Sequence, residues 1–523
     1  MRAGDSVAGW TGAESAMPIQ RVFADFVLHR TSDWRIVTRA FSVSLAAAIF
    51  FVCPSGNARG QPTLPAANHV YDTVVVGGGV AGLTAAYYLR HKDVLILEKQ
   101  DRLGGRVQTD AIGNTRVNWG TQYLPHQASP ADKFLDDLGI QFVVHRPSQV
   151  KIGFVLNHEF YPDLTALPGG LLVAWGLISE VSRSHMELRK ARQSRAQCLA
   201  LDHISAQPVP NSMPPSIAEY LSAFIRSASS APPERISQLW YDNLVLDLLS
   251  PIKLPVGGMD EVVKALAGHV LARTICNCEV FAVQDMGDCV TVTASMKERG
   301  TLTIRARACV VAVPAPQCRQ IVRDLPTWKD KALAQVEYGA YIVVTLQFSH
   351  LHWKRGLGAI VQGAVFSSWI DANATQGDWT APSVQHPAVM TFFIPTMTNS
   401  AIWSASDESV INLVQKEMEA TFPGINSSIL DARLRRHTYG EPIAAPGYFD
   451  RMFQLKEPLP RIHFAGDYTD EPWLGGAIMS GMRCASELGA ETPWAPPYRS
   501  RKTSGITRCR KGERAVGASA SRA

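Results

Sequence analysis

The alternation of apolar runs and turn residues is clearest between residues 72 and 109. Thr73 to Val76 is a short β-branched run bounded by turn residues, which predicts a buried parallel strand. The pattern then predicts a helix from Val80 to about Arg90 and a second buried strand from Asp93 to Leu97. A strand, a helix and a strand in this order predict a βαβ unit within an α/β fold.

The turn between the first strand and the helix has the spacing G-x-G-x-x-G, formed by Gly77, Gly79 and Gly82. The first glycine allows a tight turn, the second lets a phosphate approach the backbone, and the third lets helix and strand pack closely. The free N–H groups and the positive dipole end of the helix then face that phosphate. The turn therefore predicts a dinucleotide site.

An acidic residue follows at the distance that a dinucleotide site requires. Glu98 ends the second strand, 21 residues after Gly77. A carboxylate at this position can accept hydrogen bonds from the ribose hydroxyls of the nucleotide. It would repel a 2′-phosphate, so the sequence disfavours NADP.

The segment from Arg102 to Thr109 distinguishes between the remaining dinucleotides. Arg102-Leu-Gly104-Gly105-Arg106 through Thr109 resembles the R-x-G-G-R-x-x-T element of the flavin-dependent amine oxidase superfamily, which includes monoamine and polyamine oxidases, protoporphyrinogen oxidase and phytoene desaturases. In that family the element lies along the cofactor diphosphate and leads to the flavin. The resemblance implies bound FAD, with Gly104, Gly105 and Arg106 among the residues that hold it. The alternative is an ordinary glycine turn with solvated arginines.

The resemblance recurs over roughly 420 residues, from Tyr71 to Leu488. Residues 117–124 match a glycine-containing turn beside the flavin ring, and residues 255–260 match a P-x-G-G-M segment that opens a helix. Val280 falls on the strand whose backbone pairs with adenine in the family. Residues 308–316 correspond to the strand that returns to the cofactor.

A C-terminal segment carries a second set of candidate residues. Residues 462–467 predict a strand ending in Gly466-Asp467, and in the family this aspartate bonds to the ribityl or diphosphate region. Ala477 lies in a segment that resembles G-A-x-x-S-G, whose helix N-terminus faces the flavin N1–C2=O edge. A helix dipole there stabilises the negative charge of the reduced flavin.

Three aromatic residues are candidates for the catalytic pocket. Tyr439, Tyr448 and Trp473 come from segments that place aromatic side chains near the flavin face in the family. Each of them also fits an ordinary position in the hydrophobic core.

The motifs and the patterns between them predict a discontinuous architecture. A Rossmann-like FAD-binding domain takes residues 70–145, 250–325 and 455–490. An α+β substrate domain takes residues 146–249, which are helical in pattern, and 326–454, which contain strand-like runs. Residues 1–69 are interpreted as a targeting segment and linker, and residues 491–523 as a disordered basic tail.

Composition agrees with a well-cored globular enzyme, since 46% of the 523 residues are hydrophobic. The net charge of +5 arises in the tail, where eight basic and two acidic residues leave the rest of the chain at −1. Such a tail is interpreted as solvated, with contact to an anionic membrane surface as an alternative. The sequence predicts no nucleic acid partner and no metal site, because its clustered cysteines lack zinc-ligand spacing. It does not indicate an oligomeric state.

The N-terminus suggests export. Residues 41–53 form a 13-residue apolar run, preceded by Arg35 and Arg39 and followed by small residues near Ala58. This pattern is typical of a secretory signal and is short for a membrane span. We therefore expect a periplasmic or extracellular protein that begins near Arg59. A buried or disordered extension on a cytoplasmic protein is the alternative.

One departure from the family bears on the reaction. FAD accepts a hydride at N5 from a small-molecule substrate, and with no second G-x-G-x-x-G unit the electrons are expected to pass to oxygen or a quinone-like acceptor. Amine-oxidising members carry a lysine ten residues before a Phe-Trp pair, where it holds a water at N5. The corresponding residue before Trp353 is Val343. Alternatives to an amine oxidase are therefore a dehydrogenase or desaturase acting on an apolar cyclic or polyene substrate, and a non-catalytic flavoprotein.

Overall fold

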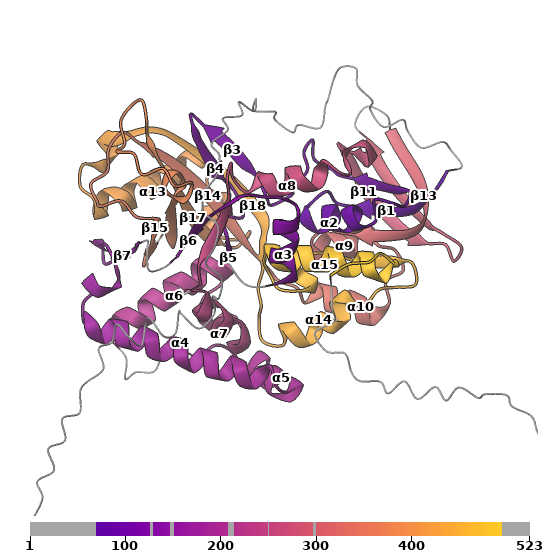
Figure 1. Cartoon of the computed structure of the whole chain (residues 1–523), viewed down its shortest axis with the longest axis horizontal. Coiled ribbons are helices and arrows are strands. Elements are labelled where there is room, and N and C mark those ends of the chain that lie inside the picture. Colours follow the sequence, from indigo (N-terminus) through magenta and orange to yellow (C-terminus); the bar gives the residue numbers. More distant parts are fainter. Residues whose placement is uncertain are drawn as a thin grey trace, which may run out of the picture. The chain divides into compact units, whose positions relative to one another are not determined.

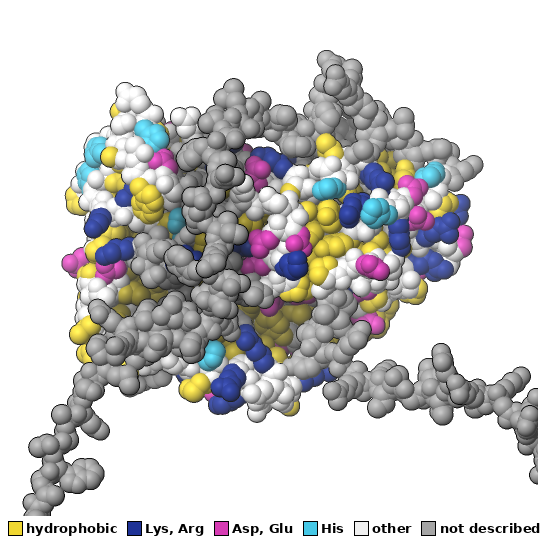
Figure 2. All heavy atoms as spheres, in the orientation of Figure 1, with side chains coloured by type: hydrophobic (Ala, Val, Ile, Leu, Met, Phe, Trp, Pro, Cys, Tyr) yellow, Lys and Arg dark blue, Asp and Glu magenta, His cyan; other side chains and the backbone are white. Residues whose placement is uncertain are grey.

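The computed structural model describes residues 69–125, 129–146, 151–207, 214–248, 250–296, 300–363 and 365–493. All of them belong to one compact unit, residues 51–523. The predicted signal segment and the basic tail beyond residue 493 lie outside the described residues. On the face shown in Figure 2, Lys and Arg side chains lie among Asp and Glu.

The first of two large sheets contains the predicted βαβ unit. Its strands run in the order β10-β2-β1-β13-β12-β11, and β19 pairs with β13. The pairs around β1 are parallel, whereas β11, β12 and β13 form an antiparallel meander. The strands are β1 (Val70–Val76), β2 (Val94–Leu97), β10 (Thr274–Ile275), β11 (Cys278–Asp285), β12 (Val290–Met296), β13 (Gly300–Val311) and β19 (Ile462–Phe464).

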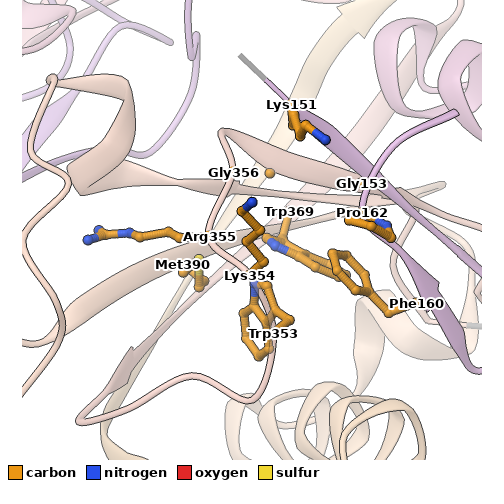
Figure 3. Close-up of a pocket in the computed structure, with 11 residues that line it drawn as sticks. Lys151, Gly153, Phe160, Pro162, Trp353, Lys354, Arg355, Gly356, Trp369 and Met390 are labelled. Carbon is orange, nitrogen blue, oxygen red and sulfur yellow. The ribbon is translucent and has the colours of Figure 1, made fainter. Parts of the chain in front are cut away.

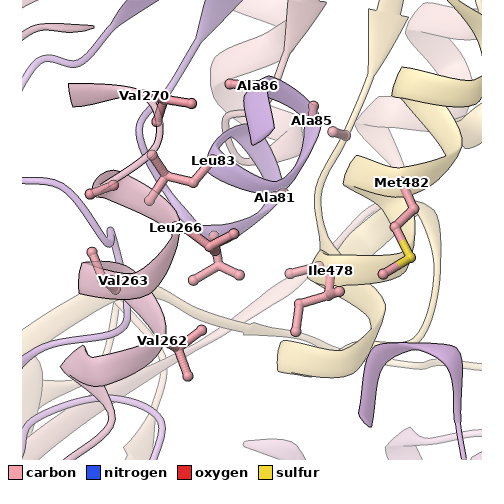
Figure 4. Packing of buried hydrophobic residues seen from close by; sticks show 14 of the residues in the cluster. Ala81, Leu83, Ala85, Ala86, Val262, Val263, Leu266, Val270, Ile478 and Met482 are labelled. Atoms are coloured by element: carbon pink, nitrogen blue, oxygen red, sulfur yellow. The ribbon is translucent and has the colours of Figure 1, made fainter. Parts of the chain in front are cut away.

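Helix α2 (Val80–Tyr88) packs on this sheet between α8 (Asp260–Ala267) and α15 (Leu474–Glu487) (Figure 4). Because neighbours cover it on several sides, α2 is buried over its first seven residues. At Gly481, an added Cβ would lie 2.4 Å from the Ala81 carbonyl oxygen, so a larger residue would separate α15 from α2. The shared core contains the residues labelled in Figure 4: Ala81, Leu83, Ala85, Ala86, Val262, Val263, Leu266, Val270, Ile478 and Met482.

The second large sheet has the strand order β18-β14-β17-β16-β15-β7-β8. Among its described strands, β15 and β7 pair in parallel and the other pairs are antiparallel. Helix α13 (Asp407–Thr421) contributes to the core on one face of the sheet (Figure 1). The strands are β7 (Ile152–Leu156), β8 (Glu159–Tyr161), β14 (Tyr338–Phe348), β15 (Gly358–Val361), β16 (Ser368–Asp371), β17 (Ala388–Thr396) and β18 (Ile429–Pro442).

A group of helices from the first predicted substrate segment packs beside this sheet: α4 (Leu171–Ala191), α5 (Arg195–Asp202), α6 (Pro215–Ser229) and α7 (Gln238–Asp247). The described part of the chain contains no helix long and apolar enough to cross a membrane. The remaining helices are α3 (Pro130–Asp137), α9 (Ala315–Ile321), α10 (Thr327–Ala334), α11 (Ala372–Thr375), α12 (Ala401–Ser404) and α14 (Tyr448–Lys456).

Two small sheets complete the fold. One is the hairpin of β3 (Thr109–Ile112) and β4 (Thr115–Asn118), and the other has the order β5-β9-β6. Its strands are β5 (Leu124–Pro125), β9 (Ile252–Pro255) and β6 (Phe142–His145).

The structure confirms the predicted fold class of an α/β domain joined to an α+β part. The first large sheet takes its strands from all three segments assigned to the FAD domain, and the second takes them from the two segments assigned to the substrate domain. The domain boundaries stay a prediction, since both parts belong to the same compact unit.

Candidate cofactor and substrate site

The glycine turn between β1 and α2 has the geometry that its spacing predicts. Gly77 has a φ of 106°, and a Cβ there would lie 2.6 Å from the Ala312 carbonyl oxygen. A Cβ on Gly82 would lie 2.1 Å from the Gly77 carbonyl oxygen, so helix and turn are in close contact. At Gly79, by contrast, an added Cβ would meet no described atom within 4 Å. The turn is therefore tight on its inner side and open at the position where a phosphate is expected.

The second glycine pair lies directly against this turn. Gly104 N–H donates to the Gly78 carbonyl at 2.9 Å, and Gly79 and Gly104 form a parallel bridge. Gly104 and Gly105 have φ values of 104° and 58°, a region in which a glycine is favoured. Arg102 stabilises the segment by donating to the Gly105 carbonyl at 2.7 Å. The structure thus brings both glycine motifs together in one cradle.

Glu98 lies beside this cradle and is buried. Its Oε2 accepts from Gly78 N–H at 2.6 Å and its Oε1 accepts from Gln100 N–H at 2.8 Å. Burial raises the pKa of Glu98 above its usual value, and these two donors oppose that change. Each carboxylate oxygen has a second lone pair for a ribose hydroxyl. The sequence did not predict that Glu98 also stabilises the glycine turn through the Gly78 N–H.

The first strand residues of β11 lie next to Glu98. Cys278 N–H donates to the Glu98 carbonyl at 2.9 Å, and Glu98 N–H donates to the Ile275 carbonyl at the same distance. Val280 follows on β11, which is the last strand of its sheet and has a register irregularity just after Val280. A backbone position on such a strand edge, beside the ribose acceptor, suits adenine.

An ion pair between a half-buried arginine and a buried aspartate joins the N-terminal and C-terminal motifs. Arg106 donates from Nη1 to Asp467 Oδ2 at 2.6 Å and from Nη2 to Oδ1 at 2.8 Å. Burial alone would lower the pKa of Arg106, but Asp467 raises it above its ordinary value. The preceding Gly466 has a φ of 145°, and its N–H donates to Ser480 Oγ on α15 at 2.9 Å. Strand β19, helix α15 and the arginine motif are therefore fixed to one another.

Two helix N-termini meet this region. Helix α2 begins after Gly79 and α15 begins after Trp473, and neither has a side-chain cap. Their first N–H groups can therefore bind an anionic group. Ala477 lies in the first turn of α15 and is nearly buried. Its N–H donates to the Trp473 carbonyl at 3.1 Å, so its contribution is to the packing and position of this turn.

The three aromatic candidates occupy different environments. Tyr439 is half-buried and packs edge-on against Tyr338, with ring centroids 5.4 Å apart. Tyr448 is 1% exposed in the core, and its hydroxyl has no partner among the described residues. Trp473 packs edge-on against Trp240 at 5.0 Å and donates from its indole to Glu471. Tyr439 is thus more accessible to solvent than Tyr448.

A separate pocket lies in the second large sheet (Figure 3). Trp353, Trp369 and Phe160 form its aromatic wall, and Lys151 and Lys354 lie at its edge. None of the predicted site residues lines this pocket. We therefore place the cofactor at the glycine cradle and not here.

Comparison with known proteins agrees with this geometry. The family model for flavin containing amine oxidoreductases matches residues 80–489. The chain belongs to this family. FAD is accordingly its cofactor, and the protein is a flavin-dependent oxidoreductase acting on a small molecule.

Relatives match most of the chain at low identity. A flavin-containing amine oxidase of Oncorhynchus mykiss is 21% identical over 460 residues, covering 81% of this chain and 86% of the relative. An L-amino acid oxidase of Bothrops pictus is 22% identical, covering 79% and 89%. Among solved structures, putrescine oxidase bound to putrescine has a TM-score of 0.65 at 17% identity, covering 80% of this chain and 99% of that one.

The described residues fit FAD. The open side of Gly79, the two uncapped helix N-termini and the adjacent Glu98 supply groups for a diphosphate and a ribose. Arg106 and Asp467 extend this set toward the second large sheet, because Arg106 Nη1 also donates to the Gly440 carbonyl on β18 at 3.1 Å. The assignment of each residue to a part of FAD stays a prediction.

Sequence reasoning missed one charged residue at this junction. Glu441 follows Gly440 on β18, and burial raises its pKa well above its usual value. It belongs to no motif, so the only signal was an acidic residue between Gly440 and Pro442 in an otherwise apolar segment.

We predict that the Arg106–Asp467 pair contributes strongly to stability. R106M would leave Asp467 buried without its cation, at a cost of about 3–5 kcal/mol in the free energy of unfolding. We expect about 3 kcal/mol, because one third of the Arg106 side chain is exposed. Urea unfolding of the purified protein measures this difference.

Two further variants serve as controls for this prediction. Lys133 and Asp137 pair on the surface with side chains 72% and 60% exposed, so K133M should change stability by no more than about 1 kcal/mol. D467N in the R106M background should recover part of the loss, because it removes the unpaired charge. Equal stability of R106M and K133M would contradict the prediction.

Proposed function

We propose that this protein oxidises a small amine by hydride transfer to FAD, with reoxidation by a quinone-like acceptor or, more slowly, by oxygen. The proposal rests on one contact: Arg106, which belongs to a cofactor motif, donates a hydrogen bond to the Gly440 carbonyl on β18. This contact brings the polar end of β18, with Tyr439 and Glu441, to the cofactor region. A reacting carbon held between these elements would be oriented and shielded from water.

Bound FAD supplies a hydride acceptor at N5. The glycine cradle would hold its diphosphate, and Glu98 its ribose. The N-terminus of α15 would stabilise negative charge that develops on the reduced ring, because the helix dipole is positive at that end. The paired strands β14 and β18 would form the wall that faces the substrate.

A test of this function is anaerobic mixing of the purified yellow protein with separate groups of substrates. We expect amines to remove the flavin absorbance, while carotenoid-like and porphyrinogen-like compounds leave it unchanged. Bleaching by an apolar polyene alone would favour the desaturase alternative, to which Val343 gives support. A protein that no small molecule bleaches would be a non-catalytic flavoprotein.

A further inference from the structure

Glu441 is a half-buried carboxylate that no described residue pairs with. Its neighbour Gly440 accepts a hydrogen bond from Arg106, so the carboxylate lies near the Arg106–Asp467 ion pair. The side chain keeps some accessible surface, yet the described residues give it neither a hydrogen bond nor an ion pair. An ionised group in such a place is costly unless a partner is supplied.

The charges around Glu441 do not balance. Arg106 is the cation beside it, but both of its terminal nitrogens already bond to Asp467. Burial raises the pKa of Glu441, Asp467 raises it further, and Arg106 only opposes this change. The protein alone therefore favours the neutral acid, whereas an added cation would favour the carboxylate.

An aromatic side chain of β14 lies beside Glu441. Gly339 lies opposite Glu441 in the β14–β18 pair, and a Cβ added to the neighbouring Gly440 would lie 2.6 Å from the Tyr341 ring, so this ring lies beside the end of β18 that carries Glu441. Tyr341 is held in place, since its hydroxyl donates to the Ser227 carbonyl at 2.7 Å and accepts from Ser230 N–H at 3.1 Å. Aromatic faces beside a carboxylate form a favourable environment for an ammonium group. The charged and titratable groups that act on Glu441 or are acted on by it are Arg106, Asp467, Tyr123, Tyr341 and Tyr448.

We propose that Glu441 is the specificity residue of the substrate site: its carboxylate binds the ammonium group of the amine. The inference rests on the proposed function and adds to it the residue that recognises the positive charge. When the ammonium binds, the Glu441 acid releases its proton to solvent and forms a charge-assisted hydrogen bond to the ligand. Neutral compounds of the same shape gain no binding affinity from this residue.

The test uses holoenzyme and cumylammonium, a cation that has no hydrogen on the carbon beside its nitrogen and so cannot donate a hydride. Titration calorimetry in two buffers of different ionisation heat gives both the affinity and the number of protons released. We expect the wild-type protein to release protons on binding, with an affinity that rises with pH. E441Q should bind at least about tenfold more weakly, which is about 1.4 kcal/mol, and release none.

Three comparisons make the result specific. E337Q changes a carboxylate that is 53% exposed and pairs with Arg235, and it should match the wild-type protein. Cumyl alcohol, the neutral analogue, should bind equally to all variants. E441D keeps the charge, so it should keep the proton release. If E441Q loses FAD, E441A takes its place as the variant without a carboxylate.

The outcomes separate this inference from the proposed function. If cumylammonium binds E441Q as tightly as the wild-type protein, or binds no form of the protein, Glu441 is not the anchor. If the benzylamine concentration that bleaches half of the flavin is the same for wild type and E441Q, Glu441 does not bind the ammonium group, although amine oxidation itself is supported. If no amine bleaches the wild-type protein, the proposed function itself fails.

Discussion

G79L is expected to give a folded but colourless protein. Gly79 has a φ of −71°, a conformation that any residue adopts, and its Cβ position is open. A leucine therefore causes no strain in the turn, but its side chain occupies the space that the FAD diphosphate needs. We expect the flavin content to fall by about tenfold or more, a loss of at least about 1.4 kcal/mol in binding. The ratio of flavin to protein absorbance after purification measures it.

Two glycine variants test whether this effect is specific. G268L makes the same change at the exposed end of α8, away from the cradle, and should keep its FAD. G77A should instead lose stability, because a Cβ at Gly77 would contact the Ala312 carbonyl at 2.6 Å in a backbone conformation that disfavours alanine. A yellow G79L protein with a full complement of FAD would show that the assigned turn does not bind the diphosphate.

The local elements of this fold could be predicted from sequence because their signals are local. The strand expected at residues 73–76 is β1, Val70–Val76, and the helix expected from Val80 is α2, Val80–Tyr88. A fully apolar β-branched run is typical of a buried parallel strand, and a glycine-rich segment is typical of a tight turn. The discontinuous order of segments came from the family resemblance and not from periodicity.

The connections inside the site could not be predicted in the same way. Arg106 and Asp467 were both candidates, but nothing in the sequence says that residues 361 positions apart form an ion pair. The hydrogen bond from Gly78 to Glu98 depends on the close contact of two loops. Glu441 was missed because its importance comes from burial beside Asp467, and burial depends on how β18 packs. Tyr448, left open between pocket and core, is a core residue by its exposure, whereas Tyr439 keeps accessible surface.

The reaction with oxygen is expected to be slow, because position 343 carries valine. Val343 is 1% exposed on β14 and packs in a cluster with Val117 and Trp119, the segment that resembles the family turn beside the flavin ring. Its cross-strand neighbour Arg435 pairs with Asp110 at the surface and lies over the Trp119 ring. The family resemblance places the lysine of amine-oxidising members at this position, and a valine cannot hold a water for proton transfer at N5.

Stopped-flow mixing of photoreduced enzyme with oxygenated buffer measures this rate without knowledge of the substrate. We expect a quinone or dye acceptor to reoxidise the flavin at least about tenfold faster than oxygen does, a difference of about 1.4 kcal/mol in activation free energy. Free flavin in the same buffers provides the control for the intrinsic reactivity of each acceptor. Reoxidation by oxygen at the rate of a dedicated oxidase would mean that another group performs the lysine's role. Glu441 would then be the first residue to replace, because it follows Gly440, which Arg106 contacts, and has no side-chain partner among the described residues. Tyr439, Tyr448 and Trp473 would come next.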